Sequence, residues 1–383
     1  MTAPSHVDQG GLEAVSVVDR IPALTGVRAF AALIVVGTHA AYTTGKYTHG
    51  YVGLLYSRME IGVPIFFVLS GFLLFGPWVR AAKAGTRAPS LRRYTWRRVR
   101  RIMPAYVVTV LAAYALYHFH EAGPNPGHTW YGLLRNLSMT QIYTDGYMFS
   151  HIHQGLTQMW SLAVEVSFYV ALPFIAYLVL AVLCRWRWQP RLALAGLAVL
   201  VLISPAWMVF VHSVDRIGHQ HLPDGAKLWL PGYLAWFIGG MMLTVLAAMG
   251  VRCYWFIAVP LVVVSYLIVS TPVAGEPTTS PSGLAQAVVK TLFYAAIATL
   301  VVAPAALGDR GWYERVLSSR PLVWLGEISY ELFLVHLVMM ELAMTQVLHW
   351  RVYTGNAATL FVVTMALSVP VAWVLHRFTR VRD

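Results

Sequence analysis

The chain has 383 residues, of which 11% are charged and 58% hydrophobic, with a mean hydropathy of +0.61 and a formal net charge of +12. A soluble globular domain carries roughly 25% charged residues. These values exclude a soluble enzyme, a disordered regulator and a secreted disulfide scaffold, and they predict an all-α polytopic integral membrane protein.

Ten apolar runs are long enough to cross a bilayer, because a span needs about 20 predominantly apolar residues. They lie at 21–41, 59–79, 102–118, 159–183, 192–212, 228–249, 253–270, 284–304, 322–347 and 357–375. We therefore expect about ten transmembrane helices.

The basic residues orient these spans. With the N-terminus inside, twenty of the 28 Lys and Arg residues fall in cytoplasmic segments, six fall in outer segments and two lie within spans. This asymmetry follows the positive-inside rule and places both termini in the cytoplasm of a multi-pass protein of the inner (plasma) membrane. Because the cations lie in short loops between spans, we expect no nucleic-acid partner.

The expected organisation is a single transmembrane domain at 21–376, between a polar cytoplasmic tail at 1–20 and a basic tail at 377–383. Within the domain, the basic cytoplasmic segment 80–101 contains interleaved apolar residues, so we expect an amphipathic helix along the inner surface. The polar and aromatic segment 119–158 forms the one long outer loop.

Two ionisable residues lie in the first span. Arg28 and His39 are eleven residues apart, which is only about 20° past three full helical turns, so both face the same way, about 16 Å apart. Ionisable groups within a membrane are costly unless they are paired or functional. We therefore treat Arg28, near the inner boundary, and His39, in the outer half, as candidate site residues.

Four further segments carry recognisable motifs. The second span contains Glu60 and a Ser70-Gly71-Phe72 turn, and an Arg-x-x-Arg pair at Arg98 and Arg101 precedes Ile102 and Pro104. The fourth span opens on Trp160-Ser161-Leu162 followed by Glu165, and the ninth contains Gly326, Ser329, Tyr330 and His336. Together with Arg28 and His39, these segments resemble, in order, the acyltransferase 3 family of bacterial multi-span O-acyltransferases.

The resemblance implies transfer of an acyl group, acetyl or another short chain, from cytoplasmic acyl-CoA to a hydroxyl of an envelope glycan or glycolipid. It places the family's arginines on Arg28, Arg98 and Arg101 and its first-span histidine on His39. One departure is Pro64, where the family commonly has an acidic residue. Glu60, one turn earlier, points from a similar face. Many members also carry a fused esterase-like domain, which we expect this chain to lack.

The chemistry of the residues supports these roles. Neutral His39 is suited to take the hydroxyl proton as a general base, or to carry the acyl group covalently. We expect Glu165, at the outer start of its span, to support His39, and Arg28, Arg98 and Arg101 to hold the donor phosphates. A possible substrate path includes Glu60, Ser70, Trp160 and His336, with Ser70 packing between helices rather than acting as a nucleophile.

We expect no bound cofactor and no metal, with acyl-CoA as a co-substrate. The His-x-His pairs at 118/120, 151/153 and 219/221 are interpreted as solvated loop residues. The alternative function is a secondary transporter that uses the same Arg, His and Glu residues for an anionic solute or protons. Acyl chain, acceptor and oligomeric state stay open, as does the choice between direct transfer and an acyl-enzyme.

Overall fold

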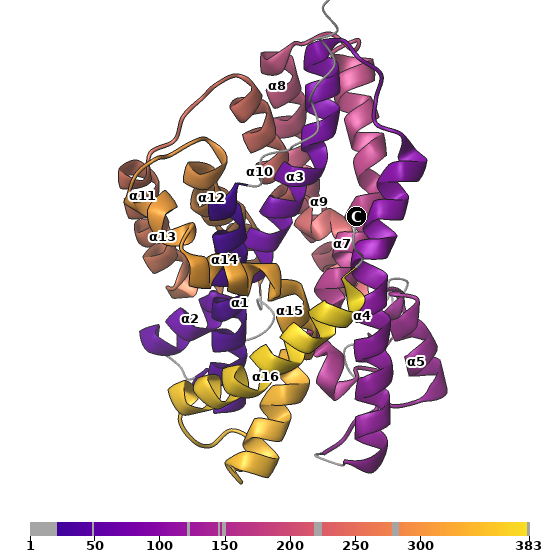
Figure 1. Cartoon of the computed structure of the whole chain (residues 1–383), viewed down its shortest axis with the longest axis vertical. Helices are drawn as coiled ribbons and strands as arrows, with labels where there is room; N and C mark the ends of the chain where they lie inside the picture. The colour runs from indigo at the N-terminus through magenta and orange to yellow at the C-terminus, as the bar shows by residue number, and fades with distance from the viewer. Residues whose placement is uncertain are drawn as a thin grey trace, which may run out of the picture.

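The computed structural model describes residues 21–47, 50–120, 123–144, 146–147, 151–217, 224–277 and 283–380. Within these ranges the regular secondary structure is helical (Figure 1), in agreement with the all-α class expected from the sequence. The tail at 1–20 and positions 381–383 lie outside the described residues.

The helices in the first half are α1 (Pro22–Thr43), α2 (Tyr51–Arg58), α3 (Gly62–Ala84), α4 (Leu91–Phe119), α5 (Trp130–Leu137), α7 (Trp160–Ala176), α8 (Pro190–Val201) and α9 (Ile203–Ile217). Those in the second half are α10 (Leu230–Ala248), α11 (Trp255–Val269), α12 (Leu284–Ala306), α13 (Trp312–Leu317), α14 (Arg320–Glu327), α15 (Ser329–Leu342) and α16 (Ala357–Thr379). Short 3₁₀ and π turns join or extend them, including η1 (Met59–Ile61), η3 (Gln154–Met159), η4 (Tyr177–Leu183) and η7 (Ala343–Val347).

Among the described residues, nine helical stretches are long and apolar enough to cross a membrane. They account for nine of the ten expected spans. The remaining one, at 253–270, forms α11, which has only 15 residues. At 1.5 Å per residue it extends about 22 Å, less than the roughly 30 Å of bilayer hydrocarbon.

Two expected segments fold differently from their prediction. Residues 91–101 of the basic segment form the first turns of α4, which continues without a break into the span, so they are not a separate surface helix. The run expected as one span at 322–347 is two helices, α14 and α15, because the backbone leaves helical geometry at Ile328 (φ −98°, ψ 5°). Hydropathy alone does not predict such a break, because the segments on both sides of it are predominantly apolar.

Small residues bring the central helices close together. α3 packs along α10, and a Cβ added at Gly71 would lie 2.0 Å from the carbonyl oxygen of Phe237. Likewise, a Cβ at Gly240 would lie 1.9 Å from the carbonyl oxygen of Val68. In a membrane, helices associate through this close backbone approach.

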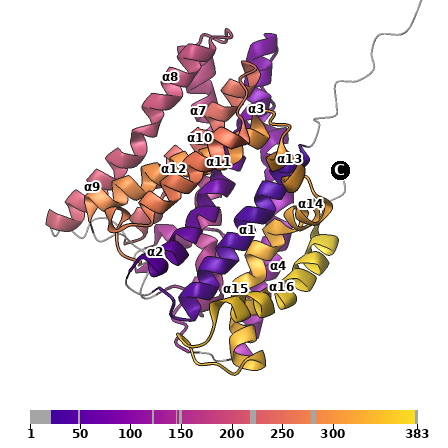
Figure 2. The same ribbon diagram turned by 90° about the vertical axis from the view of Figure 1, so that its left-hand side faces the viewer.

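The first helix occupies the middle of the molecule. α1 packs against α3, α14, α15 and α16 and runs between them in Figure 2. Because it is surrounded by helices, the polar residues of α1 face protein cavities rather than lipid. This placement is what brings Arg28 and His39 to the candidate site.

Candidate active site

Three arginines meet in a small cavity near the start of α1. The cavity has a volume of about 90 Å³, and Arg28 from α1, Arg98 and Arg101 from α4, Ser70 from α3 and Glu165 from α7 line it. The expected grouping of the three arginines is therefore found. We call this space the arginine cavity.

Glu165 is held inside the arginine cavity by two hydroxyl donors. Ser70 Oγ donates to Glu165 Oε1 at 2.5 Å, and the hydroxyl of Tyr169, one turn later on α7, donates to the same oxygen at 2.7 Å. The sequence predicted that Glu165 supports His39. The structure places Glu165 beside the arginines instead, because that face of α7 packs toward α3 and α4.

The arginine cavity carries an excess of positive charge. Three guanidinium groups face a single carboxylate, which leaves two positive charges without a counter-ion among the described lining residues. The buried Nε atom of Arg98 also has no hydrogen-bond partner. Guanidinium groups bind phosphate and carboxylate oxygens through paired hydrogen bonds, so this space is suited to an anion.

A larger cavity, of about 780 Å³, lies next to the first. His39, Glu60, Pro64 and Trp160 line it, and we call it the histidine cavity. Tyrosine and tryptophan side chains make up much of the remaining wall, contributed by Tyr42, Tyr47, Tyr147, Tyr233, Trp236, Tyr294 and Tyr353. An aromatic wall with a few polar groups is typical of sites for small organic ligands.

The partner of His39 is a second histidine. His336, on α15, is fully buried, and its Nε2 lies 3.2 Å from His39 Nδ1, with the two ring centroids 5.0 Å apart. His39 Nδ1 also lies 2.8 Å from the carbonyl oxygen of Val35. His336 thus takes the place beside His39 that the sequence assigned to Glu165.

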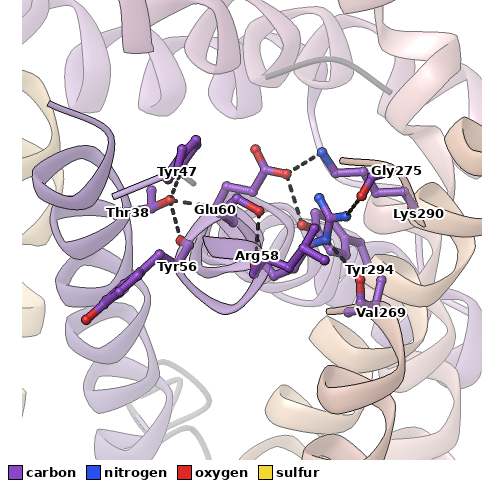
Figure 3. A network of polar contacts seen from close by, with 11 residues as sticks. Thr38, Tyr47, Tyr56, Arg58, Glu60, Val269, Gly275, Lys290 and Tyr294 are labelled. Atoms are coloured by element: carbon purple, nitrogen blue, oxygen red, sulfur yellow. Dashed lines mark hydrogen bonds and ion pairs between the residues drawn. The ribbon is translucent and has the colours of Figure 1, made fainter. Parts of the chain in front are cut away.

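Glu60 anchors a polar network on the wall of the histidine cavity (Figure 3). Its carboxylate forms an ion pair with Lys290 of α12 and accepts a hydrogen bond of 2.9 Å from the hydroxyl of Tyr294. Glu60 and Pro64 line the same cavity, so the chain retains a carboxylate there although proline occupies the expected acidic position. Burial and the nearby Glu60 carboxylate raise the pKa of Tyr47, which keeps its hydroxyl protonated.

The histidines of segment 119–158 are not all solvated as the sequence predicted. His153 is 2% exposed and packs against the rings of Tyr114 and Tyr117, so its interpretation as a solvated residue is wrong. This burial and the neighbouring His128 lower the pKa of His153 to about 3. The pair at 219/221 lies outside the described residues. In the ranges that are described, no three His, Cys, Asp or Glu side chains form a metal-binding group.

The predicted site residues are thus divided between two adjoining cavities. Arg28, Arg98, Arg101, Glu165 and Ser70 line the arginine cavity, whereas His39, Glu60 and Trp160 line the histidine cavity, with His336 directly behind His39. Tyr169, Lys290 and Phe333 were not predicted as site residues from the sequence. Of these, Lys290 could have been recognised, because it is an ionisable residue within an apolar run. Glu341, which the sequence offers with Glu327 and Glu331 as a residue of a polar path, lines the histidine cavity.

The chain is similar in sequence to known acyltransferases. The chain is 26% identical to the peptidoglycan O-acetyltransferase OatA of Listeria monocytogenes over 90% of its own length, and 24% identical to the O-acetyltransferase OatA of Staphylococcus aureus over 82%. It spans about half of each of these relatives, 54% and 50% of their lengths. It is also 29% identical to the acyltransferase MdmB of Streptomyces mycarofaciens, with 93% of this chain and 90% of that protein covered.

No solved structure matches the chain. A family described as an acyltransferase domain matches residues 21–377, which includes every residue of the two cavities. The chain therefore belongs to the acyltransferase 3 family.

Proposed function

We propose that this protein is a membrane O-acyltransferase that moves an acetyl or other short acyl group from acyl-CoA to a hydroxyl of an envelope glycan or glycolipid. The observation that carries the proposal is that a cationic cavity adjoins a cavity containing His39, with Val63 and Phe333 lining both. Its membership of an acyltransferase family supports the same reaction class.

The donor binds at the arginine cavity, which the charge asymmetry of the sequence assigns to the cytoplasmic side of the plasma membrane. Phosphate oxygens of acyl-CoA accept hydrogen bonds from Arg28, Arg98 and Arg101. Because the cavity has a volume of only about 90 Å³, it holds part of the donor, and the nucleotide remains outside near the exposed Arg101. The thioester then points toward Phe333 and the histidine cavity.

The transfer takes place beside His39. Its free ring nitrogen accepts the proton of the acceptor hydroxyl, and the hydroxyl oxygen attacks the thioester carbonyl carbon. The carbon–sulfur bond then breaks, and the leaving thiolate takes the proton back from His39. The histidine thus begins and ends the cycle neutral.

The acceptor occupies the histidine cavity, whose aromatic and polar wall suits a sugar. The aromatic rings pack against the apolar faces of a sugar ring, and the carboxylate of Glu60 accepts hydrogen bonds from its hydroxyls. The relatives named as O-acetyltransferases, one of them a peptidoglycan O-acetyltransferase, support an envelope glycan as the acceptor class.

The test is mass spectrometry of glycans and lipids extracted from the envelope of cells that lack the gene. Complementation with the wild-type gene restores an acyl-sized mass increment in one fraction, whereas His39→Ala does not. His118→Ala is the matched control, because His118 is exposed on α4 and outside both cavities, and it restores the increment. The proposal is wrong if no fraction differs in acyl content between deletion and wild-type cells; solute uptake into vesicles then tests the transporter alternative.

A further inference from the structure

A chain of hydrogen bonds runs from His39 through His336 to the backbone of α15. α1 and α15 lie side by side (Figure 2), and His39 Nδ1 is 3.2 Å from His336 Nε2. The other ring nitrogen of His336, Nδ1, lies 2.7 Å from the carbonyl oxygen of Phe333. His39 Nδ1 is at the same time 2.8 Å from the carbonyl oxygen of Val35.

The two carbonyl oxygens fix where the protons lie. A carbonyl oxygen can only accept, so Nδ1 of His336 must carry a hydrogen that it donates to Phe333, and Nδ1 of His39 must carry one that it donates to Val35. A neutral imidazole has a single N–H, which leaves Nε2 of each ring with a lone pair. His336 Nε2 is therefore an acceptor, and the Nδ1–H of His39 is shared between Val35 and His336.

We propose that His336 is a positioning residue that holds His39 in the tautomer with its proton on Nδ1, which leaves Nε2 free as the catalytic base. The inference rests on the proposed function, in which His39 takes the proton of the acceptor hydroxyl. During transfer the proton enters and leaves at Nε2 of His39. The Nδ1–H stays on His39 throughout, and His336 neither gains nor loses a proton.

The burial of His336 explains why an imidazole suits this role. The side chain is 0% exposed, and an ionised carboxylate at such a site would require a charged partner. A neutral ring supplies a second acceptor for the Nδ1–H of His39, beside the carbonyl oxygen of Val35, without introducing a charge. The carboxylate of Glu60 and the ammonium of Lys290 lie on the same cavity wall but are paired with each other.

Variants at position 336 separate this role from simple packing. His336→Leu keeps an apolar side chain of similar size but removes the acceptor, and we expect kcat to fall about 100-fold with KM for both substrates nearly unchanged. His336→Gln retains an acceptor oxygen and recovers kcat to within about tenfold of wild type. His118→Leu is the control, because it makes the same substitution at an exposed histidine outside the cavities, and we expect it to have wild-type kinetics.

A readout independent of activity is the ¹⁵N spectrum of histidine-labelled protein in lipid, with the His39 signals identified by their loss in His39→Gln. Within α1 the carbonyl oxygen of Val35 also accepts the backbone N–H of His39, so without His336 it is only a shared acceptor for the Nδ1–H. We therefore expect one tautomer of His39 in wild type and in His336→Gln, and a mixture in His336→Leu. An unchanged His39 tautomer in folded His336→Leu overturns the inference, as does equal loss of kcat in the Leu and Gln variants. If the spectra behave as expected but wild-type protein transfers no acyl group, only the proposed function fails.

Discussion

Val63 on α3 and Phe333 on α15 each line both cavities, so these two side chains form the boundary between the arginines and His39. The Phe333 ring packs edge-on against Phe66, with centroids 6.3 Å apart, and lies 5.6 Å from the ring of His336. In the proposed reaction, an acyl group that moves from the arginine cavity to the histidine cavity passes Phe333.

Shortening the side chain at this boundary should relax the choice of acyl chain. We expect Phe333→Leu to accept longer acyl groups than wild type, because it widens the contact between the cavities while the backbone carbonyl that binds His336 remains. Competition between acyl-CoA donors of increasing length, with the product analysed by mass spectrometry, measures this change. Phe75→Leu, at a buried position of α3 outside both cavities, is the control for lost packing; an equal change there contradicts a boundary role for Phe333.

Neighbouring arginines on α4 offer a matched test of the donor site. Arg98 lines the arginine cavity, whereas Arg97 is exposed and does not. Because a hydrogen bond to a charged group contributes about 1.5–3 kcal/mol, Arg98→Gln should raise KM for acyl-CoA roughly 10- to 100-fold. Arg97→Gln should leave KM unchanged. If both variants raise KM equally, the effect comes from general surface charge rather than from the cavity.

The ion pair between Glu60 and Lys290 should show in stability measurements. Lys290→Met leaves the Glu60 carboxylate without its cationic partner, so we expect a loss of about 2 kcal/mol in folding free energy, seen as a lower midpoint of thermal unfolding in detergent. Adding Glu60→Gln to Lys290→Met removes the unpaired charge and should restore part of the loss. If the losses of folding free energy in Lys290→Met and Glu60→Gln simply add in the double variant, the two side chains are not coupled.

Acid should weaken the packing of the segment around His153. Its pKa of about 3 in the folded protein lies below the ordinary value of about 6.5, so the opened loop binds more protons in this interval. The free energy that holds this segment in its packed position is therefore at its full value above pH 6.5 and is smaller by about 2 kcal/mol at pH 5. Hydrogen exchange of residues 123–135, corrected for the intrinsic effect of pH, should accelerate on acidification. His153→Gln should remove most of this pH dependence; its persistence would assign the effect to another group, such as His128.

The sequence predicted the membrane fold and several of the residues that line the two cavities, but not which of these residues contact one another. Helical periodicity correctly placed Arg28 and His39 about three turns apart on one face, and α1 does present them to two adjoining cavities. Glu165 was misassigned because its position along the chain suggested a depth near His39, whereas η3 adds a 3₁₀ segment before α7 and the packing of α7 directs Glu165 toward Ser70.

The contact between His336 and His39 also could not be obtained from sequence order. α14 and α15, which are separated by the break at Ile328, both pack against α1, and this packing brings His336 to His39. The short length of α11 and the uninterrupted course of α4 were also not predicted, because the length of a helix and its breaks depend on packing as well as on hydropathy. Lys290 carried a signal as an intramembrane cation, but only the structure pairs it with Glu60.

The most direct test of the central claim uses purified protein in lipid vesicles, supplied with acetyl-CoA radiolabelled in the acetyl group and with an extracted envelope glycan fraction. We expect wild-type protein and His118→Ala to transfer label to a base-labile ester on the glycan or glycolipid. His39→Gln should bind acetyl-CoA but transfer label no faster than protein-free vesicles. Label transfer by His39→Gln at the wild-type rate would show that His39 is not the catalytic base.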